Sequence, residues 1–291
     1  MELLQQLAGL ALLVCACWLG WRRWIAPYVH DLHADGMGML LLAVLAITGG
    51  LIGSPFWWMG DPSSFSWTLP PLAGRLLGAA GFSFAVIGCY VLESRQQQLV
   101  RAYIVMLAVY LAPLVAAILL FHLDRFDWSA PITYAFFIVA GGMAAAALWY
   151  LVRRTTLGKG FQDAPAEQLP IFMRSWLWLV ALVMGLWGLA MFVYPSGPWP
   201  QVWVWPQDPL TSRLIATMLL TLCAGALMGL RSVAMARMSL WMFATYGTGA
   251  AAACFCNLTQ GKPVPAAYAT AFCALAVVSL ALLIQVRSAK L

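Results

Sequence analysis

Charged residues are scarce in this chain. Only 9% of its 291 residues are Asp, Glu, Lys or Arg, whereas 63% are hydrophobic. A typical soluble domain carries roughly 25% charged residues, so the polar side chains are too few to cover a soluble fold of this size. The composition therefore excludes an ordinary soluble domain and predicts an all-α polytopic membrane protein, because helices satisfy their own backbone hydrogen bonds in lipid.

The sequence also lacks the usual signatures of catalysis and of metal binding. Its seven cysteines form no CxxC pair and no spaced ligand set. It contains no nucleophile elbow, phosphate loop, HExxH motif or pair of carboxylates within an apolar run. We therefore expect that the protein is not an enzyme, and we predict no catalytic residue, no metal and no cofactor.

The net charge of +6 comes from basic residues scattered between apolar runs. No basic cluster with interleaved aromatics occurs, so we expect no nucleic-acid partner. The use of Arg over Lys is typical of a high-GC bacterium, since only three of the basic residues are Lys. We therefore expect the protein to lie in a bacterial cytoplasmic membrane, with membrane lipids as partners.

Long apolar runs are what the chain has in abundance. A membrane-spanning helix needs about 20 mostly apolar residues. The first run is followed, not preceded, by the basic pair Arg22-Arg23, so we expect a retained helix rather than a cleaved signal peptide. Nine stretches qualify as spans: 3–21, 37–59, 71–93, 101–122, 131–152, 173–194, 211–231, 238–257 and 265–286.

The basic residues indicate how these spans are oriented. With the N-terminus outside, 12 of the 16 Lys and Arg residues fall on the inner side and four on the outer side. Cytoplasmic loops carry an excess of Lys and Arg. The alternation therefore predicts an outside N-terminus and a cytoplasmic C-terminus.

An internal repeat divides the chain. Segment 67–76 recurs as segment 205–214, with Trp, Pro-Leu and Arg-Leu at matching positions, and Pro131 and Tyr134 recur as Pro265 and Tyr268. Each unit has an even number of spans, so both enter the membrane from the same side and the repeat is parallel, with its axis along the membrane normal. We predict a 1 + 4 + 4 organisation: a first helix and inner loop (1–36), unit one (37–152), a cytoplasmic linker (153–172) and unit two (173–291).

The repeated segment also supplies the candidate site. It places Arg75 and Arg213 about one turn inside the membrane, where an unpaired guanidinium is costly. We favour a structural interpretation, in which each arginine fastens an outer loop to a helix start and Asp61 and Asp208 are the nearest ion-pair partners. The alternative is a ligand-binding pocket at the outer face, formed by Arg75, Arg213, Trp57, Trp58, Trp67, Trp203 and Trp205.

Three functions remain open. Because the span centres hold almost no ionisable residue, an ion-coupled pump is disfavoured, and the many small residues are typical of closely packed helices. We therefore predict a non-catalytic scaffold or accessory subunit, with membrane lipids and other subunits or further copies of itself as partners. The alternatives are a transporter-like facilitator of a neutral or amphipathic solute, suggested by the duplication, and an enzyme or binding protein acting on a lipid-borne substrate at the outer face.

Overall fold

The computed structural model describes residues 2–61, 64–65, 67–158, 160–163 and 167–288, and in these residues all regular elements of three or more residues are helical. Seven helices in this part of the chain are long and apolar enough to cross a membrane, which confirms an α-helical polytopic membrane fold. Six are α2 (Ala34–Met59), α3 (Pro71–Ser94), α4 (Gln97–Phe121), α7 (Ile171–Val193), α8 (Pro209–Gly229) and α10 (Ala266–Ser288).

The seventh membrane helix, over Pro131–Val152, is a composite. It consists of α5 (Pro131–Phe136), the π-helical turn η5 (Phe137–Gly141) and α6 (Gly142–Val152). Two more long helices, α1 (Glu2–Gly20) and α9 (Val233–Thr259), coincide with the remaining predicted stretches. Shorter helical turns are η1 (Trp21–Ile25) and η2 (Ala26–Tyr28) after α1, and η4 (Leu123–Arg125) after α4.

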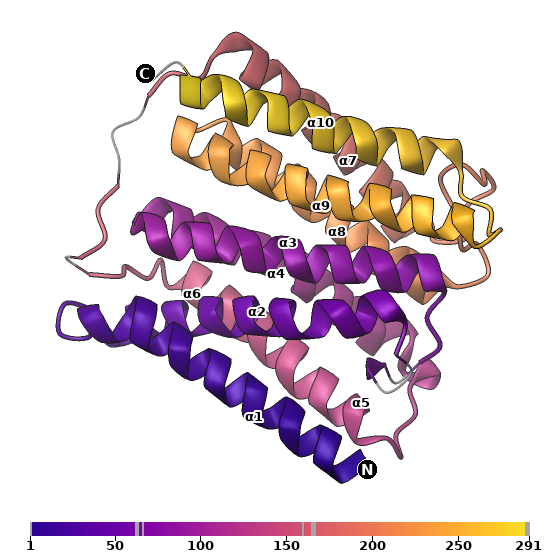
Figure 1. Cartoon of the computed structure of the whole chain (residues 1–291), viewed down its shortest axis with the longest axis horizontal. Coiled ribbons are helices and arrows are strands. Elements are labelled where there is room, and N and C mark those ends of the chain that lie inside the picture. The colour runs from indigo at the N-terminus through magenta and orange to yellow at the C-terminus, as the bar shows by residue number, and fades with distance from the viewer. Residues whose placement is uncertain (1, 62–63, 66, 159, 164–166, 289–291) are drawn as a thin grey trace.

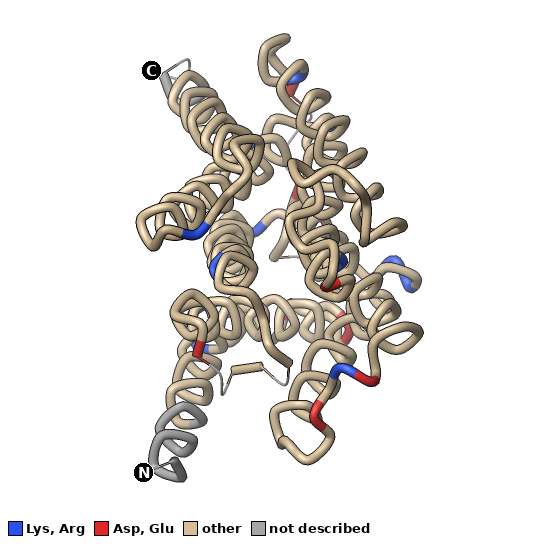
Figure 2. Tube along the Cα trace, turned by 90° about the vertical axis from the view of Figure 1, so that its right-hand side faces the viewer, with Lys and Arg blue, Asp and Glu red and all other residues tan. Residues whose placement is uncertain are grey.

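The helices lie side by side in two groups. In Figure 1, α2 to α6 occupy the lower half of the molecule and α7 to α10 the upper half, while α1 crosses below α2. The two groups meet where α3 packs along α9 and where α4 packs along α8. Figure 2 shows the charged residues as isolated positions among long stretches of other residues, as expected for a bundle surrounded by lipid.

Small residues allow the helices to approach closely. A Cβ atom added at Gly188 on α7 would lie 3.0 Å from the Ala216 carbonyl oxygen of α8. At Gly247 on α9, an added Cβ would lie 2.7 Å from the Ala276 nitrogen of α10. An added Cβ at Gly247 would overlap the α10 backbone and one at Gly188 would crowd the α8 backbone, so both glycines allow neighbouring helices to approach closely.

The segment that follows α6 is folded against one end of the bundle. Leu157 is buried, and its backbone N–H donates to Gln97 Oε1 at 3.0 Å. The Leu157 carbonyl accepts from the His33 N–H at 3.2 Å, and Gly158 pairs with Leu32 in a single antiparallel bridge. The start of the predicted linker therefore connects the loop before α2 to the first turn of α4.

Candidate functional site

Arg75 lies one turn into α3 and reaches across to the end of α9. Its guanidinium donates to Gln260 Oε1 at 3.0 Å and to Asn257 Oδ1. Asn257 is buried in the last turn of α9, where the unpaired carbonyls of a helix carry partial negative charge. The recorded partners of Arg75 are therefore amide oxygens of the second group of helices, and its ion pair with Asp61 stays a prediction.

Arg213 makes the matching contact from one turn into α8. It donates through Nε to the Phe192 carbonyl at 3.2 Å, its NH1 lies 2.6 Å from His122 Nε2, and its guanidinium sits 4.8 Å from the Phe121 ring centroid. His122 follows α4, so this arginine reaches the other group of helices.

The chemistry of arginine assigns the proton on His122. Arginine only donates hydrogen bonds, so Nε2 accepts and the neutral ring carries its proton on Nδ1. Burial, and then the positive charge of Arg213, lower the pKa of His122 below its ordinary value. The neutral imidazole is thus the form that this contact requires.

Asp208 does form an ion pair, but with Arg125 at 3.5 Å and not with Arg213. It is also the N-cap of α8, accepting from the Thr211 N–H at 3.3 Å and from the Thr211 hydroxyl at 2.5 Å. Asp208 precedes α8 as its N-cap, whereas Arg213 lies one turn into the helix. Their recorded partners therefore differ.

The predicted tryptophans of the first group occupy two places. Trp57 and Trp58, at the end of α2, are half-buried against α3. The Trp57 ring lies over Gly81, where an added Cβ would be 2.8 Å from it, and Trp58 packs against Gly78. Both therefore fill the α2–α3 contact.

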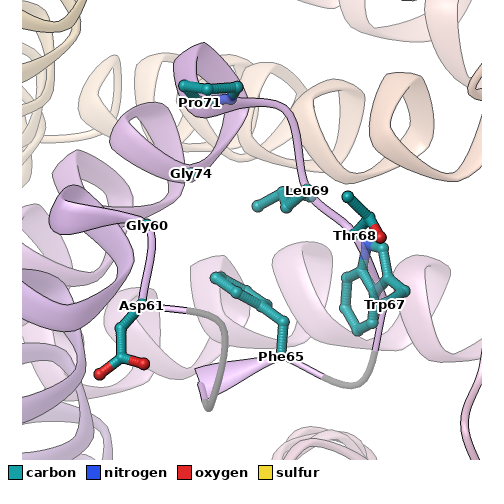
Figure 3. Close-up of a pocket in the computed structure, with 8 residues that line it drawn as sticks. All are labelled: Gly60, Asp61, Phe65, Trp67, Thr68, Leu69, Pro71 and Gly74. Carbon is teal, nitrogen blue, oxygen red and sulfur yellow. The ribbon is translucent and has the colours of Figure 1, made fainter.

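Trp67 lies in the loop before α3 and lines a cavity of about 330 Å³ (Figure 3). Its ring is 5.0 Å from the Phe126 ring, and its buried Nε1–H has no hydrogen-bond partner among the described residues. Asp61 also belongs to the lining, but Arg75 does not. The cavity is lined by Gly60, Asp61, Phe65, Trp67, Thr68, Leu69, Pro71 and Gly74.

Trp203 and Trp205 are buried in the loop between α7 and α8. Trp203 Nε1 donates to the Tyr194 carbonyl at 2.6 Å, and the Trp205 ring is perpendicular to the Tyr268 ring at 6.3 Å. The recorded ring contacts thus join each set of tryptophans to its own group of helices. Ligand binding by all seven predicted residues together stays a prediction. The side-chain partners of the two arginines were not anticipated from the sequence.

A second cavity, of about 580 Å³, lies at the opposite end of the bundle between the two groups of helices. It is lined by Gln97, Gln98, Arg101, Ala102, Val105, Leu151, Asp163, Met228, Arg231 and Met235. The chain matches no protein-family model, and neither a curated protein nor a solved structure is significantly similar to it. The proposed function therefore rests on the sequence and the structure of this chain.

Proposed function

We propose that the protein is a non-catalytic scaffold or accessory subunit of a membrane assembly. It has nine membrane-spanning helices, organised as one helix followed by two parallel four-helix units. The observation that carries the assembly role is the outward face of the composite helix α5–η5–α6, where a Cβ added at either of two adjacent glycines would meet no described residue within 4 Å.

The contacts between the two units support the parallel repeat. α3 of unit one lies along α9 of unit two, and α8 lies along α4. In the repeat, α3 corresponds to α8 and α4 to α9, so Arg75 at the end of α9 and Arg213 at the end of α4 are reciprocal contacts. Figure 1 shows α1 and α10 running in the same direction, as an odd number of spans requires.

The composite helix has the features of a docking face. Only 17% of its most apolar window is buried, the smallest share among the seven membrane helices found in the described residues. A Cβ added at Gly141 or Gly142 would meet nothing within 4 Å, and the neighbouring Ile138 is 73% exposed. Adjacent glycines beside a large apolar residue form a notch that admits another helix closely, and van der Waals packing in such notches drives helix association in lipid.

A single glycine substitution tests the assembly role. Gly142→Leu should fill the notch and abolish a stoichiometric complex with a second membrane subunit or a second copy, measured by native co-purification with quantitative mass spectrometry. Gly49→Leu on α2 is the matched control, because an added Cβ there also meets nothing within 4 Å. An assembly that survives Gly142→Leu unchanged, or the absence of any stoichiometric partner, would contradict the proposal.

We also place the chain in a bacterial cytoplasmic membrane, with the N-terminus outside and the linker inside. Thr68 and Thr156 are both exposed and lie at opposite ends of the bundle. In a variant without the seven native cysteines, Thr68→Cys should react with an impermeant maleimide on intact spheroplasts, and Thr156→Cys should react only after lysis. The reverse pattern would invert the topology.

The alternative function is a transporter-like facilitator, and one observation favours it. The inner cavity is lined from α4 and α6 on one side and from α8 and α9 on the other, as expected for a path between two units. Above it, Met106 of α4 contacts Gly225 of α8, where an added Cβ would lie 3.0 Å from the methionine methyl carbon. A facilitator must open this contact, so solute flux through proteoliposomes should disappear when Met106 is cross-linked, through Met106→Cys, to a cysteine at Gly225.

A further inference from the structure

We propose that the inner cavity between the two units binds the phosphate head group of an anionic phospholipid, with Arg101 and Arg231 as the donors. This inference does not depend on the docking face of the composite helix. The cavity lies at the contact between the two units, and the scaffold role by itself assigns no ligand to it.

The position of the cavity suits a lipid head group. It opens at the end of the bundle that carries most of the basic residues, where α4 begins, α8 ends and the α8–α9 turn holds Arg231. Anionic lipid head groups bind in basic pockets between transmembrane helices on the cytoplasmic side. Its volume of about 580 Å³ lies within the range of about 300–1,000 Å³ found for small-molecule sites.

The lining changes from polar to apolar with depth. Gln97, Gln98 and Arg101 occupy the first turns of α4, and Ala102 and Val105 follow on the same helix. Four residues of a helix correspond to a rise of about 6 Å, so Val105 lies one turn deeper than Arg101. The buried Met228 and Met235 complete the apolar part from unit two. A phosphate at the rim with glycerol and the first acyl carbons below it matches this gradient.

The two arginines are available to a ligand. Neither the Arg101 nor the Arg231 guanidinium has a recorded hydrogen bond or ion pair within the described residues, although both side chains line the same cavity and come from different units. A guanidinium binds phosphate through parallel N–H donors. Two guanidiniums facing one cavity can therefore hold one phosphate between the units.

One carboxylate, that of Asp163, also lines the cavity and offers a further test. Asp163 Oδ1 accepts from the Gln98 N–H at 2.7 Å, so this carboxylate is held at the N-terminal turn of α4. Its negative charge lies in the same lining as the two arginines and opposes an incoming phosphate. Removal of the charge with retention of the acceptor, by Asp163→Asn, should strengthen binding, an effect that a merely damaged fold cannot produce.

The test measures lipid binding by the full chain in nanodiscs that contain phosphatidylglycerol and phosphatidylcholine. Native mass spectrometry counts the retained lipids. The Arg101→Gln/Arg231→Gln double variant should weaken phosphatidylglycerol binding by about tenfold or more. Asp163→Asn should strengthen it, and phosphatidylcholine retention should not change. Arg174→Gln is the matched control, since Arg174 is exposed at the same end of the bundle but outside the cavity, and it should leave binding within about twofold of the parent.

Three outcomes would overturn the proposal. The double variant could retain phosphatidylglycerol as the parent does, or phosphatidylglycerol and phosphatidylcholine could be retained equally. Alternatively, glycerol 3-phosphate or inorganic phosphate could displace the lipid at equal concentration, which would assign the cavity to a soluble phosphate compound. Intrinsic tryptophan fluorescence during thermal unfolding checks that each variant is folded. If the double variant loses the lipid but keeps the assembly that depends on Gly142, the lipid site is independent of the scaffold role.

Discussion

The composite helix that begins at Pro131 and helix α10, which begins at Ala266, hold matching places in the predicted repeat, but they pack differently. Tyr268 of α10 is completely buried, and its hydroxyl donates to the Val202 carbonyl at 3.0 Å. Its predicted repeat counterpart, Tyr134 of α5, is 52% exposed and donates to the Trp128 carbonyl in the preceding loop, also at 3.0 Å. Similar local sequence thus yields a core residue in one unit and a surface residue in the other.

The difference arises in the neighbouring helices. Gly247 lets α9 approach the backbone of α10, whereas Gly141 and Gly142 face open space on the composite helix. The π-helical turn at Phe137–Gly141 also interrupts the regular face of the composite helix. The most apolar window of α10 is therefore 39% buried, whereas that of the composite helix is 17% buried.

The largest expected effect compares the two tyrosines. Tyr268→Ala should lower the free energy of unfolding by about 3–5 kcal/mol, because a large buried aromatic leaves a cavity. Tyr134→Ala should lower it by less than about 1 kcal/mol. Denaturant unfolding in detergent, followed by tryptophan fluorescence, measures both. Equal losses would show that the two helices do not differ in packing.

The next effect compares two glycines. Gly247→Val should destabilise by about 1–3 kcal/mol or more, because the added atoms overlap the α10 backbone. Gly142→Val, with open space around its Cβ, should change the unfolding free energy by less than about 1 kcal/mol. The same unfolding assay applies, and a larger loss at Gly142 would contradict an uncovered face in the isolated chain.

A smaller effect concerns the contact between the units. Arg75→Ala leaves the buried Asn257 side chain without its donor, and an unsatisfied buried polar group costs about 1–3 kcal/mol. A double-mutant cycle with Asn257→Ala isolates the pair, and coupling of at least about 0.5 kcal/mol is expected for residues in direct contact. Additive losses in the cycle would place the stabilising role of Arg75 elsewhere.

The smallest effect is a dependence of stability on pH, which we expect for the Arg213–His122 contact and not for the Arg75–Asn257 contact. The pKa of His122 is lowered in the folded protein, so the unfolded chain binds the proton more readily. Stability from this contact should be fully present above about pH 6.5, the ordinary histidine pKa, and should fall as the pH falls below it. His122→Gln should remove this pH dependence, whereas Asn257→Ala should leave it in place. Melting temperatures between pH 5 and 8, in steps of about half a unit, measure it.

The helices were predictable because the length of an apolar run, and the polar, Pro and Gly residues at its ends, define each of them. The stretch 131–152 coincides with the composite helix Pro131–Val152, and the stretch 71–93 coincides with α3 to within one residue. The π-helical turn was not predicted, since no residue in Phe137–Gly141 forces it. Nor were the partners of the arginines, because Asn257 lies 182 residues from Arg75 and was one of many polar residues at helix ends.

The sequence by itself determined the class of protein, the positions of its apolar helices and the presence of two arginines in equivalent segments, because these depend on local composition and on transfer between water and lipid. Only the tertiary structure decided that these arginines bridge helix groups far apart in the chain. It also decided that Tyr268 is buried while Tyr134 is exposed, and that two basic side chains share a cavity at one end of the bundle. Those outcomes depend on which helices pack together, and side-chain partners across such contacts are set by the packing rather than by neighbours in the sequence.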